Sequence, residues 1–167
     1  MGLGFWLAGC GERSPTPPHG TGDVDPQFGH LLRAQPPLPT VRLWLGDQVV
    51  LAEVARRPVE IATGMMFRDT LPEGHGMLFV FPDASRRSFW MRNCRVPLSA
   101  AYIDPDGVIL EIIDLEPLNE EPAPSQSEHV QFVLEVPRNW FARHRIGPGT
   151  LVRTERGSLR QTFFGVR

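Results

Sequence analysis

The sequence of 167 residues contains no lysine and only two cysteines, Cys10 and Cys94. All seventeen basic residues are arginine, and with nineteen acidic residues the formal net charge is −2. Nucleic-acid binding normally needs a basic surface that neutralises phosphates, so we expect no nucleic-acid partner. No apolar run approaches the roughly 18 residues that cross a bilayer. The two cysteines lie far apart in the sequence, which does not favour a structural disulfide.

Common catalytic and metal-binding motifs are also absent from the sequence. It contains no Cys-x-x-Cys, His-Glu-x-x-His, Gly-x-Ser-x-Gly or phosphate-binding glycine loop. We therefore expect no metal ion and no cofactor, and we favour a binding module over an enzyme.

The first ten residues indicate export and lipid attachment. Residues 2–9 are apolar or small and lead into Leu7-Ala8-Gly9-Cys10, which resembles the lipobox of bacterial lipoproteins. The resemblance implies that residues 1–9 are a signal segment and that acylated Cys10 holds the protein to a membrane on its periplasmic or cell-surface side. A chance apolar N-terminus remains an alternative, because no basic residue lies between Met1 and Cys10.

Residues 10–39 are rich in proline and glycine, a composition typical of a semi-extended tether. The alternative is an ordered arm that lies on the domain through Phe28, Leu31 and Leu32.

Residues 40–167 predict a single α+β domain. Apolar segments at 41–45 and 48–54 flank Gly46-Asp47, and segments at 100–104 and 108–113 flank a Pro-Asp-Gly turn, so each pair predicts a β-hairpin. Pro58 and Gly64 suit the start and the end of a short helix over 59–63.

The remaining elements are short strands, a loop and one more helix. Residues 77–81, 88–91, 130–136 and 151–154 predict strands, and the acidic, Pro-rich residues 115–127 predict a surface loop. Asn139 suits the N-cap of a helix that runs to His144. Together the pattern predicts a small, mainly antiparallel β-barrel or twisted sheet with short helices.

A block of methionines, aromatics and embedded polar residues is the most distinctive part of the domain. It comprises residues 64–68, 71–73, 76–81, 88–93, 97–98 and 101–104. In order and spacing this block resembles the domain-of-unknown-function family 192, an uncharacterised protein family, over roughly residues 50–154. The resemblance implies a compact β-rich domain, often exported in bacteria, and no settled activity. The sequence departs from the family pattern at Cys94, where Thr is usual, and at Ser99, where Asp is usual.

Polar groups within this apolar block are the candidate ligand-binding residues, because a buried charge is costly unless it is paired. The candidates are Arg68, His75, Trp90, Arg92, Asn93 and Tyr102. We expect a pocket that is floored by residues 89–93 and edged by Arg68 and the turn at 74–76, taking a small molecule or an envelope protein. The competing interpretation of Arg68 is a structural pair with a carboxylate such as Asp69 or Asp104, or hydrogen bonds to loop carbonyls, and that of the aromatics is core packing.

Two other functions remain open. An envelope glycan or peptide hydrolase or transferase would use His75 or a carboxylate among Glu73, Asp104 and Glu111. Cu(I) handling would use soft sulfur ligands. The candidate ligands are four methionines together with Cys94 or His75, namely Met65, Met66, Met77 and Met91. Methionines among aromatic residues are nevertheless more typical of a core.

Overall fold

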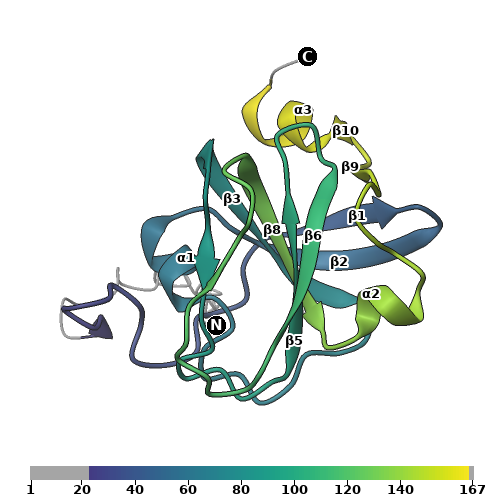
Figure 1. The fold of residues 1–167 in the computed structure, drawn as a ribbon. Helices are drawn as coiled ribbons and strands as arrows, with labels where there is room; N and C mark the ends of the chain where they lie inside the picture. Colours follow the sequence, from purple (N-terminus) through teal and green to yellow (C-terminus); the bar gives the residue numbers. More distant parts are fainter. Residues whose placement is uncertain (1–22, 166–167) are drawn as a thin grey trace, which may run out of the picture.

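The computed structural model describes residues 23–165 and confirms an α+β fold (Figure 1). The strands are β1 (Thr40–Leu45), β2 (Gln48–Ala55), β3 (His75–Ser85), β4 (Ser88–Phe89), β5 (Leu98–Ile103), β6 (Ile109–Leu115), β7 (Ala123–Pro124), β8 (Val130–Pro137), β9 (Val152–Thr154) and β10 (Gly157–Ser158). The helices are α1 (Pro58–Thr63), α2 (Trp140–Arg143) and α3 (Leu159–Phe164). None of the helices in this part of the chain is long and apolar enough to cross a membrane.

Eight strands form one twisted sheet in the order β10-β9-β1-β2-β3-β8-β5-β6. Every pairing in it is antiparallel except β2 with β3, which run parallel across the connection that contains α1. The sheet curls toward closure, because Ile109 at the start of β6 exchanges backbone hydrogen bonds with Gly149 and Thr150 ahead of β9. An isolated bridge between Val108 and Leu151 adds to this contact, but no continuous ladder closes the sheet.

Most of the predicted elements are confirmed, because the hydrophobic alternation and the turn residues of the sequence indicate the same element boundaries. In β1 the inward positions Val41, Leu43 and Leu45 alternate with outward ones, and Gly46 takes a positive φ of 60° in the two-residue turn. Helix α1 ends at Gly64 as expected. The predicted strand at 88–91 is shorter than expected and lies in β4, which pairs with β7 inside the predicted loop at 115–127.

The sequence interpretation missed the C-terminal helix α3. Ser158 accepts a hydrogen bond from the Gln161 backbone while the Gln161 side chain accepts one from the Ser158 backbone, a reciprocal cap whose Ser-x-x-Gln signature is present in the sequence. Phe163 and Phe164 then pack on Phe132 of β8, each at 6.1 Å between ring centroids. Asn139 does precede α2, but it takes a positive φ of 62° and its side chain makes no capping hydrogen bond.

The described part of the predicted tether, residues 23–39, lies against the domain, as the ordered-arm alternative proposed. The Leu31 backbone donates to the Thr63 hydroxyl (2.9 Å), and the Gln35 amide donates to the carbonyl of Gly64 (2.8 Å). Leu31 is buried, whereas Leu32, which the ordered-arm alternative also placed on the domain, is 54% exposed. We call residues 23–39 the arm. The predicted signal segment, Cys10 and the rest of the tether lie outside the described residues.

The sheet has an apolar core on each of its two faces. One core fills the curled interior and includes Leu78, Phe132 and Leu134. The other lies on the outer face, under α1 and the segments around β4, and includes Met65, Met77 and Phe79. Strands β3 and β8 contribute to both, so side chains that would normally face solvent are buried on both sides of the sheet.

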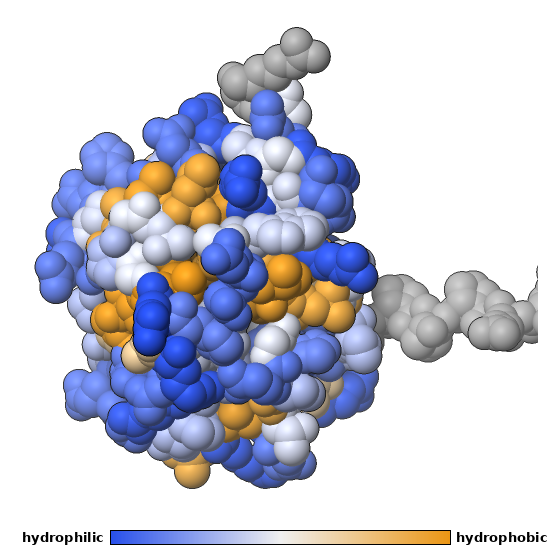
Figure 2. All heavy atoms as spheres, turned by 90° about the vertical axis from the view of Figure 1, so that its right-hand side faces the viewer, coloured by the Kyte–Doolittle hydropathy of each residue, from blue (hydrophilic) through white to orange (hydrophobic). Residues whose placement is uncertain are grey.

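Figure 2 shows the side of the molecule that carries the β1–β2 hairpin and α2, where apolar residues form separate patches among polar ones. The large apolar side chains that are exposed in residues 23–165 are Leu32, Val49, Leu51, Leu118 and Leu151. That side therefore presents no continuous apolar surface of the size that marks an interaction site.

Strand β3 passes close to the backbone of β8 at Gly76. A Cβ atom there would clash with the carbonyl oxygen of Glu135 and would also meet side chains of Val136 and Val50. We expect Gly76→Ala to lower the free energy of unfolding by about 1–3 kcal/mol, the usual cost of overpacking. Urea denaturation with Gly147→Ala as the matched control measures this, since a Cβ at Gly147 would meet nothing within 4 Å. Equal stability of the two variants would contradict the close approach.

Candidate functional site

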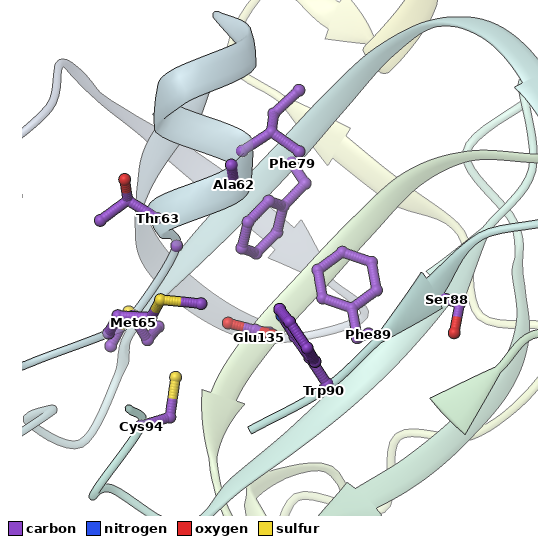
Figure 3. A pocket seen from close by; sticks show the side chains of 12 residues that line it. Ala62, Thr63, Met65, Phe79, Ser88, Phe89, Trp90, Cys94 and Glu135 are labelled. Atoms are coloured by element: carbon purple, nitrogen blue, oxygen red, sulfur yellow. The ribbon is translucent and has the colours of Figure 1, made fainter. Parts of the chain in front are cut away.

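A cavity of about 180 Å³ opens in the outer core, between α1 and the sheet (Figure 3). Its lining comes from four parts of the chain. These are residues 61–66 at the end of α1, residues 88–90 and 94 around β4, and single side chains of β3 and β8. The lining residues are Ile61, Ala62, Thr63, Gly64, Met65, Met66, Phe79, Ser88, Phe89, Trp90, Cys94 and Glu135.

The α1 wall depends on an unusual backbone conformation at Gly64. This residue ends α1 with φ 47° and ψ −127°, and a Cβ there would lie 3.2 Å from the Phe79 ring. Only glycine takes this conformation readily. The chain then turns so that Met65 and Met66 are buried, and Phe67 continues with a positive φ of 63°. The Phe67 backbone donates to the Asn93 carbonyl (2.8 Å), which joins this wall to the opposite one.

The opposite wall is built from aromatic residues of β4 and the turn that follows it. The Phe89 ring packs edge-on against Phe79, with 4.9 Å between ring centroids. Trp90 packs edge-on against Phe28 of the arm, with 5.1 Å between centroids. The Met91 backbone donates to Asn119 (2.7 Å), so the acidic loop at 115–127 is fixed to this wall.

The floor of the cavity is Glu135 in β8, which pairs with Met77 on β3 and with Ala100 on β5. Its side chain is 4% exposed, and no residue of the described range 23–165 donates a hydrogen bond to its carboxyl group. Figure 3 shows it between the Phe79, Phe89 and Trp90 rings on one side and Met65 and Cys94 on the other. Burial raises the pKa of Glu135 to about 8, so the carboxyl group is largely protonated at neutral pH.

Cys94 is buried beside this carboxyl group. Burial, and secondarily the charge of Glu135, raises the pKa of the Cys94 thiol to about 12. The thiol therefore stays protonated at neutral pH, and it lacks the thiolate that nucleophilic catalysis requires.

Arg68 does not border the cavity, because it pairs with a carboxylate elsewhere. Its guanidinium donates two hydrogen bonds to Glu53 of β2, at 2.5 and 2.8 Å. Although burial acts in the opposite direction, the hydrogen bond from Arg68 holds the pKa of Glu53 below its usual value. Arg68 is therefore in a structural pair with a carboxylate, as the competing interpretation held, but the partner is Glu53 and not Asp69 or Asp104. Glu53 reaches Arg68 through the parallel pairing of β2 with β3, which the local sequence pattern does not indicate.

The other five sequence candidates are dispersed. Of these, only Trp90 lines the cavity. The Arg92 guanidinium lies over the rings of Phe28 (4.5 Å) and Trp90 (5.4 Å), at the outer rim. Asn93 takes a positive φ of 56°, and its amide nitrogen lies 4.0 Å from the Met66 sulfur.

Tyr102 and His75 lie away from any shared pocket. Tyr102 is fully buried and donates its hydroxyl to the Ala123 carbonyl (2.5 Å), so it offers no exposed aromatic platform. His75 is exposed at the start of β3, with its ring 3.2 Å from the Glu73 carbonyl. The expected edge at Arg68 and residues 74–76 is therefore replaced by α1 and Glu135.

The carboxylates of the hydrolase alternative do not meet one another. Glu73 binds Arg143 (2.9 Å) and lies 3.3 Å from the His144 ring. Asp104 accepts from the backbone of its own turn, and Glu111 accepts from the Gln126 backbone (2.7 Å). None of these three carboxylates lines the cavity.

The methionines of the copper alternative all lie in the outer core. Met65, Met66, Met77 and Met91 are each at most 3% exposed, together with buried Cys94. Within residues 23–165, no group of three or more His, Cys, Asp or Glu side chains is arranged to hold a metal ion.

Sequence reasoning passed over Glu135, although a signal for it was present. In β8 the inner face carries Phe132, Leu134 and Val136, and the outer face carries Val133 and then Glu135. A single acidic residue in a strand that is apolar on both faces indicates a carboxyl group that the fold buries.

Comparison with known proteins identifies an uncharacterised family and two similar solved structures. A family model described as DUF192, "Uncharacterized ACR", matches residues 41–154. A crystal structure of a protein of unknown function from Novosphingobium aromaticivorans DSM 12444 is 31% identical, with a TM-score of 0.66, and the match covers 78% of this chain and 90% of that one. A protein from Sinorhizobium meliloti 1021, described as a candidate transcription regulator, is 29% identical with a TM-score of 0.64, over 69% and 92% of the two chains. No curated protein matches the chain significantly.

The raised pKa of Glu135 predicts that stability depends on pH through this residue. The folded protein binds the Glu135 proton more tightly than the unfolded chain does, so ionisation at higher pH costs stability. Wild type should therefore lose stability relative to Glu135→Gln as the pH rises from about 4.5 to about 8. The difference should reach a few kcal/mol, because each pKa unit corresponds to about 1.4 kcal/mol. Urea denaturation at pH 5.5, 7 and 8.5 measures it.

The matched control for this comparison is Glu155→Gln, which changes an exposed carboxylate. A difference between wild type and Glu135→Gln that stays constant with pH, as for the control, would show that burial does not perturb this group.

Proposed function

The chain belongs to the DUF192 family of uncharacterised proteins, and we propose that its domain is a binding module that takes a small ligand into the cavity at Glu135. We further propose that acylated Cys10 holds this module at the cell-envelope side of a membrane.

The observation that carries the binding proposal is the buried carboxyl group without a partner in residues 23–165. The Glu135 oxygens reach the cavity, since His30 Nε2 is the only fully buried side-chain nitrogen or oxygen atom without a partner in the described residues. Drying such a carboxyl group without a new hydrogen bond would cost about 1–3 kcal/mol, whereas an apolar side chain of similar shape would avoid that cost. Glu135 nevertheless lies on a central strand and lines a cavity. A ligand that hydrogen-bonds to this group would remove the penalty, which is the usual logic of a polar anchor in an apolar pocket.

The chemistry of the cavity favours binding over catalysis. Glu135 and Cys94 are the only ionisable side chains among the lining residues of the described chain. General acid–base or nucleophilic catalysis needs a second group that exchanges a proton with the first, or an ionised nucleophile. A thiol whose pKa is raised to about 12 supplies neither near neutral pH.

The arm supports a site that lies close to the proposed anchor. Asp23, where the described chain begins, lies thirteen positions after Cys10. A fully extended segment of this length spans at most about 45 Å. From Asp23 the arm runs to Phe28, which contacts Trp90 at the cavity rim. The cavity would therefore stay within a few nanometres of the membrane surface.

Binding in the cavity can be tested with Met methyl NMR on protein labelled at methionine. Three probe classes would be titrated, namely short amines, short carboxylates and short alcohols. We expect at least one class to shift the Met65 and Met66 methyl resonances with a Kd of about 1 mM or lower, equivalent to about −4 kcal/mol. Ala62→Met, which fills the cavity from α1, should abolish the shifts.

Ala142→Met is the matched control, because Ala142 is an exposed residue of α2. Its binding should equal that of wild type. If no probe class shifts either methionine, the cavity is not a ligand site.

Lipid attachment can be tested by expressing the full chain in a bacterium supplied with labelled palmitate. Wild type should incorporate label and sediment with membranes, whereas Cys10→Ser should lose the label and remain in the supernatant. Cys94→Ser is the control that must keep the label, because Cys94 is the only other cysteine. Labelling that survives Cys10→Ser, or that never occurs, contradicts the anchor.

A further inference from the structure

The ligand class can be narrowed from the groups that face the cavity, an inference that rests on the proposed binding function. Thr63 uses its hydroxyl to donate to the Val59 carbonyl and to accept from the Leu31 backbone. Ser88 contributes an exposed hydroxyl group, and the remaining lining side chains are thioethers, a thiol and aromatic or aliphatic groups. Among the described lining residues, Glu135 therefore offers the strongest hydrogen-bonding group that remains free for a ligand.

Among the described lining residues, none is basic and able to receive an anion. The arginines in the adjoining segments are engaged elsewhere. Arg87 lies over the Phe81 ring, and Arg95 pairs with Asp69. Arg68 forms its two hydrogen bonds with Glu53, and Arg92 lies over the Phe28 and Trp90 rings at the rim. A ligand carboxylate or phosphate placed in the cavity would meet the carboxyl group of Glu135 with no compensating positive charge.

The aromatic lining suits a cation. Phe79, Phe89 and Trp90 surround one side of the Glu135 carboxyl group (Figure 3), and aromatic rings attract cations through their negative faces. Such an attraction strengthens when a bound ligand displaces water from the cavity.

We propose that the cavity binds a small protonated primary amine, whose N–H groups donate to the Glu135 carboxyl group and whose short carbon chain packs on the aromatic and methionine walls. The volume of about 180 Å³ is below the 300–1,000 Å³ of pockets for drug-sized ligands. The ligand is therefore a small amine, or the amino-terminated end of a larger molecule.

Binding of the amine releases a proton. In the free protein near neutral pH the carboxyl group carries its proton, and the adjacent ammonium ion favours the carboxylate. The Glu135 O–H proton leaves to solvent while the ammonium keeps its own three protons. The net reaction converts ammonium plus carboxylic acid into an ammonium–carboxylate pair and one released proton.

Calorimetric titration of the full chain at pH 7 tests the proposal with three probes of equal length, propylammonium, propionate and propan-1-ol. Propylammonium should bind at least tenfold more tightly than the other two. Its affinity should fall at least tenfold in Glu135→Gln and stay unchanged in Glu155→Gln. In weakly buffered solution a pH electrode should record close to one proton released per propylammonium bound by wild type and none by Glu135→Gln.

The outcomes separate this inference from the binding function on which it rests. If propionate or propan-1-ol binds as tightly as propylammonium and Ala62→Met abolishes that binding, the cavity is a ligand site but not an amine site. Undiminished propylammonium affinity in Glu135→Gln, or binding without proton release, also overturns the amine proposal. If Ala62→Met leaves the binding of every probe unchanged, the cavity is not the site and both proposals fail.

Discussion

The site depends on one constraint: the fold holds a carboxyl group in the middle of a β-sheet, away from bulk water. Glu135 lies on β8, between strands that bury their side chains on both faces, and its neighbours across the sheet are Met77 and Ala100. A charge there would lack the solvation it has in water, so the group keeps its proton. The protein thus retains a polar group whose ionisation the surrounding sheet disfavours.

The position of Glu135 and the shape of the cavity depend on the backbone at two glycines. Gly76 allows β3 to approach β8 beside Glu135, and Gly64 allows the chain after α1 to fold over Phe79. Both glycines occupy places where a Cβ would press against a neighbour, and Gly64 also has a conformation that other residues adopt only with strain. The walls and floor of the cavity are therefore defined by two points of close approach between segments that are distant in sequence.

Much of the fold could be predicted because hairpins and short helices are encoded locally. The turn at Gly46-Asp47 and the alternation in β1 specify one hairpin, and Pro58 and Gly64 delimit α1. The parallel pairing of β2 with β3 has no comparable local signature, and the partner of Arg68 was mistaken for that reason. Within the site, the sequence indicated the methionines and Trp90 as part of a distinctive block. It did not single out Glu135, because strands β3 and β5, rather than its sequence neighbours, create the environment of this residue. The sequence left both a tether and an ordered arm open for residues 23–39, because proline-rich composition does not reveal the hydrogen bonds that Gln35 makes to the end of α1.

The contact between Phe28 and Trp90 links the arm mechanically to the mouth of the cavity. A pull on the chain ahead of Asp23 acts first on the arm, where the load is carried by the aromatic contact and by a few hydrogen bonds to α1. The strands bear that load only after the arm has peeled away, because β1 begins at Thr40 and is clamped on both sides by β2 and β9. Traction from the N-terminal side would thus disturb the mouth of the cavity while the sheet remains intact.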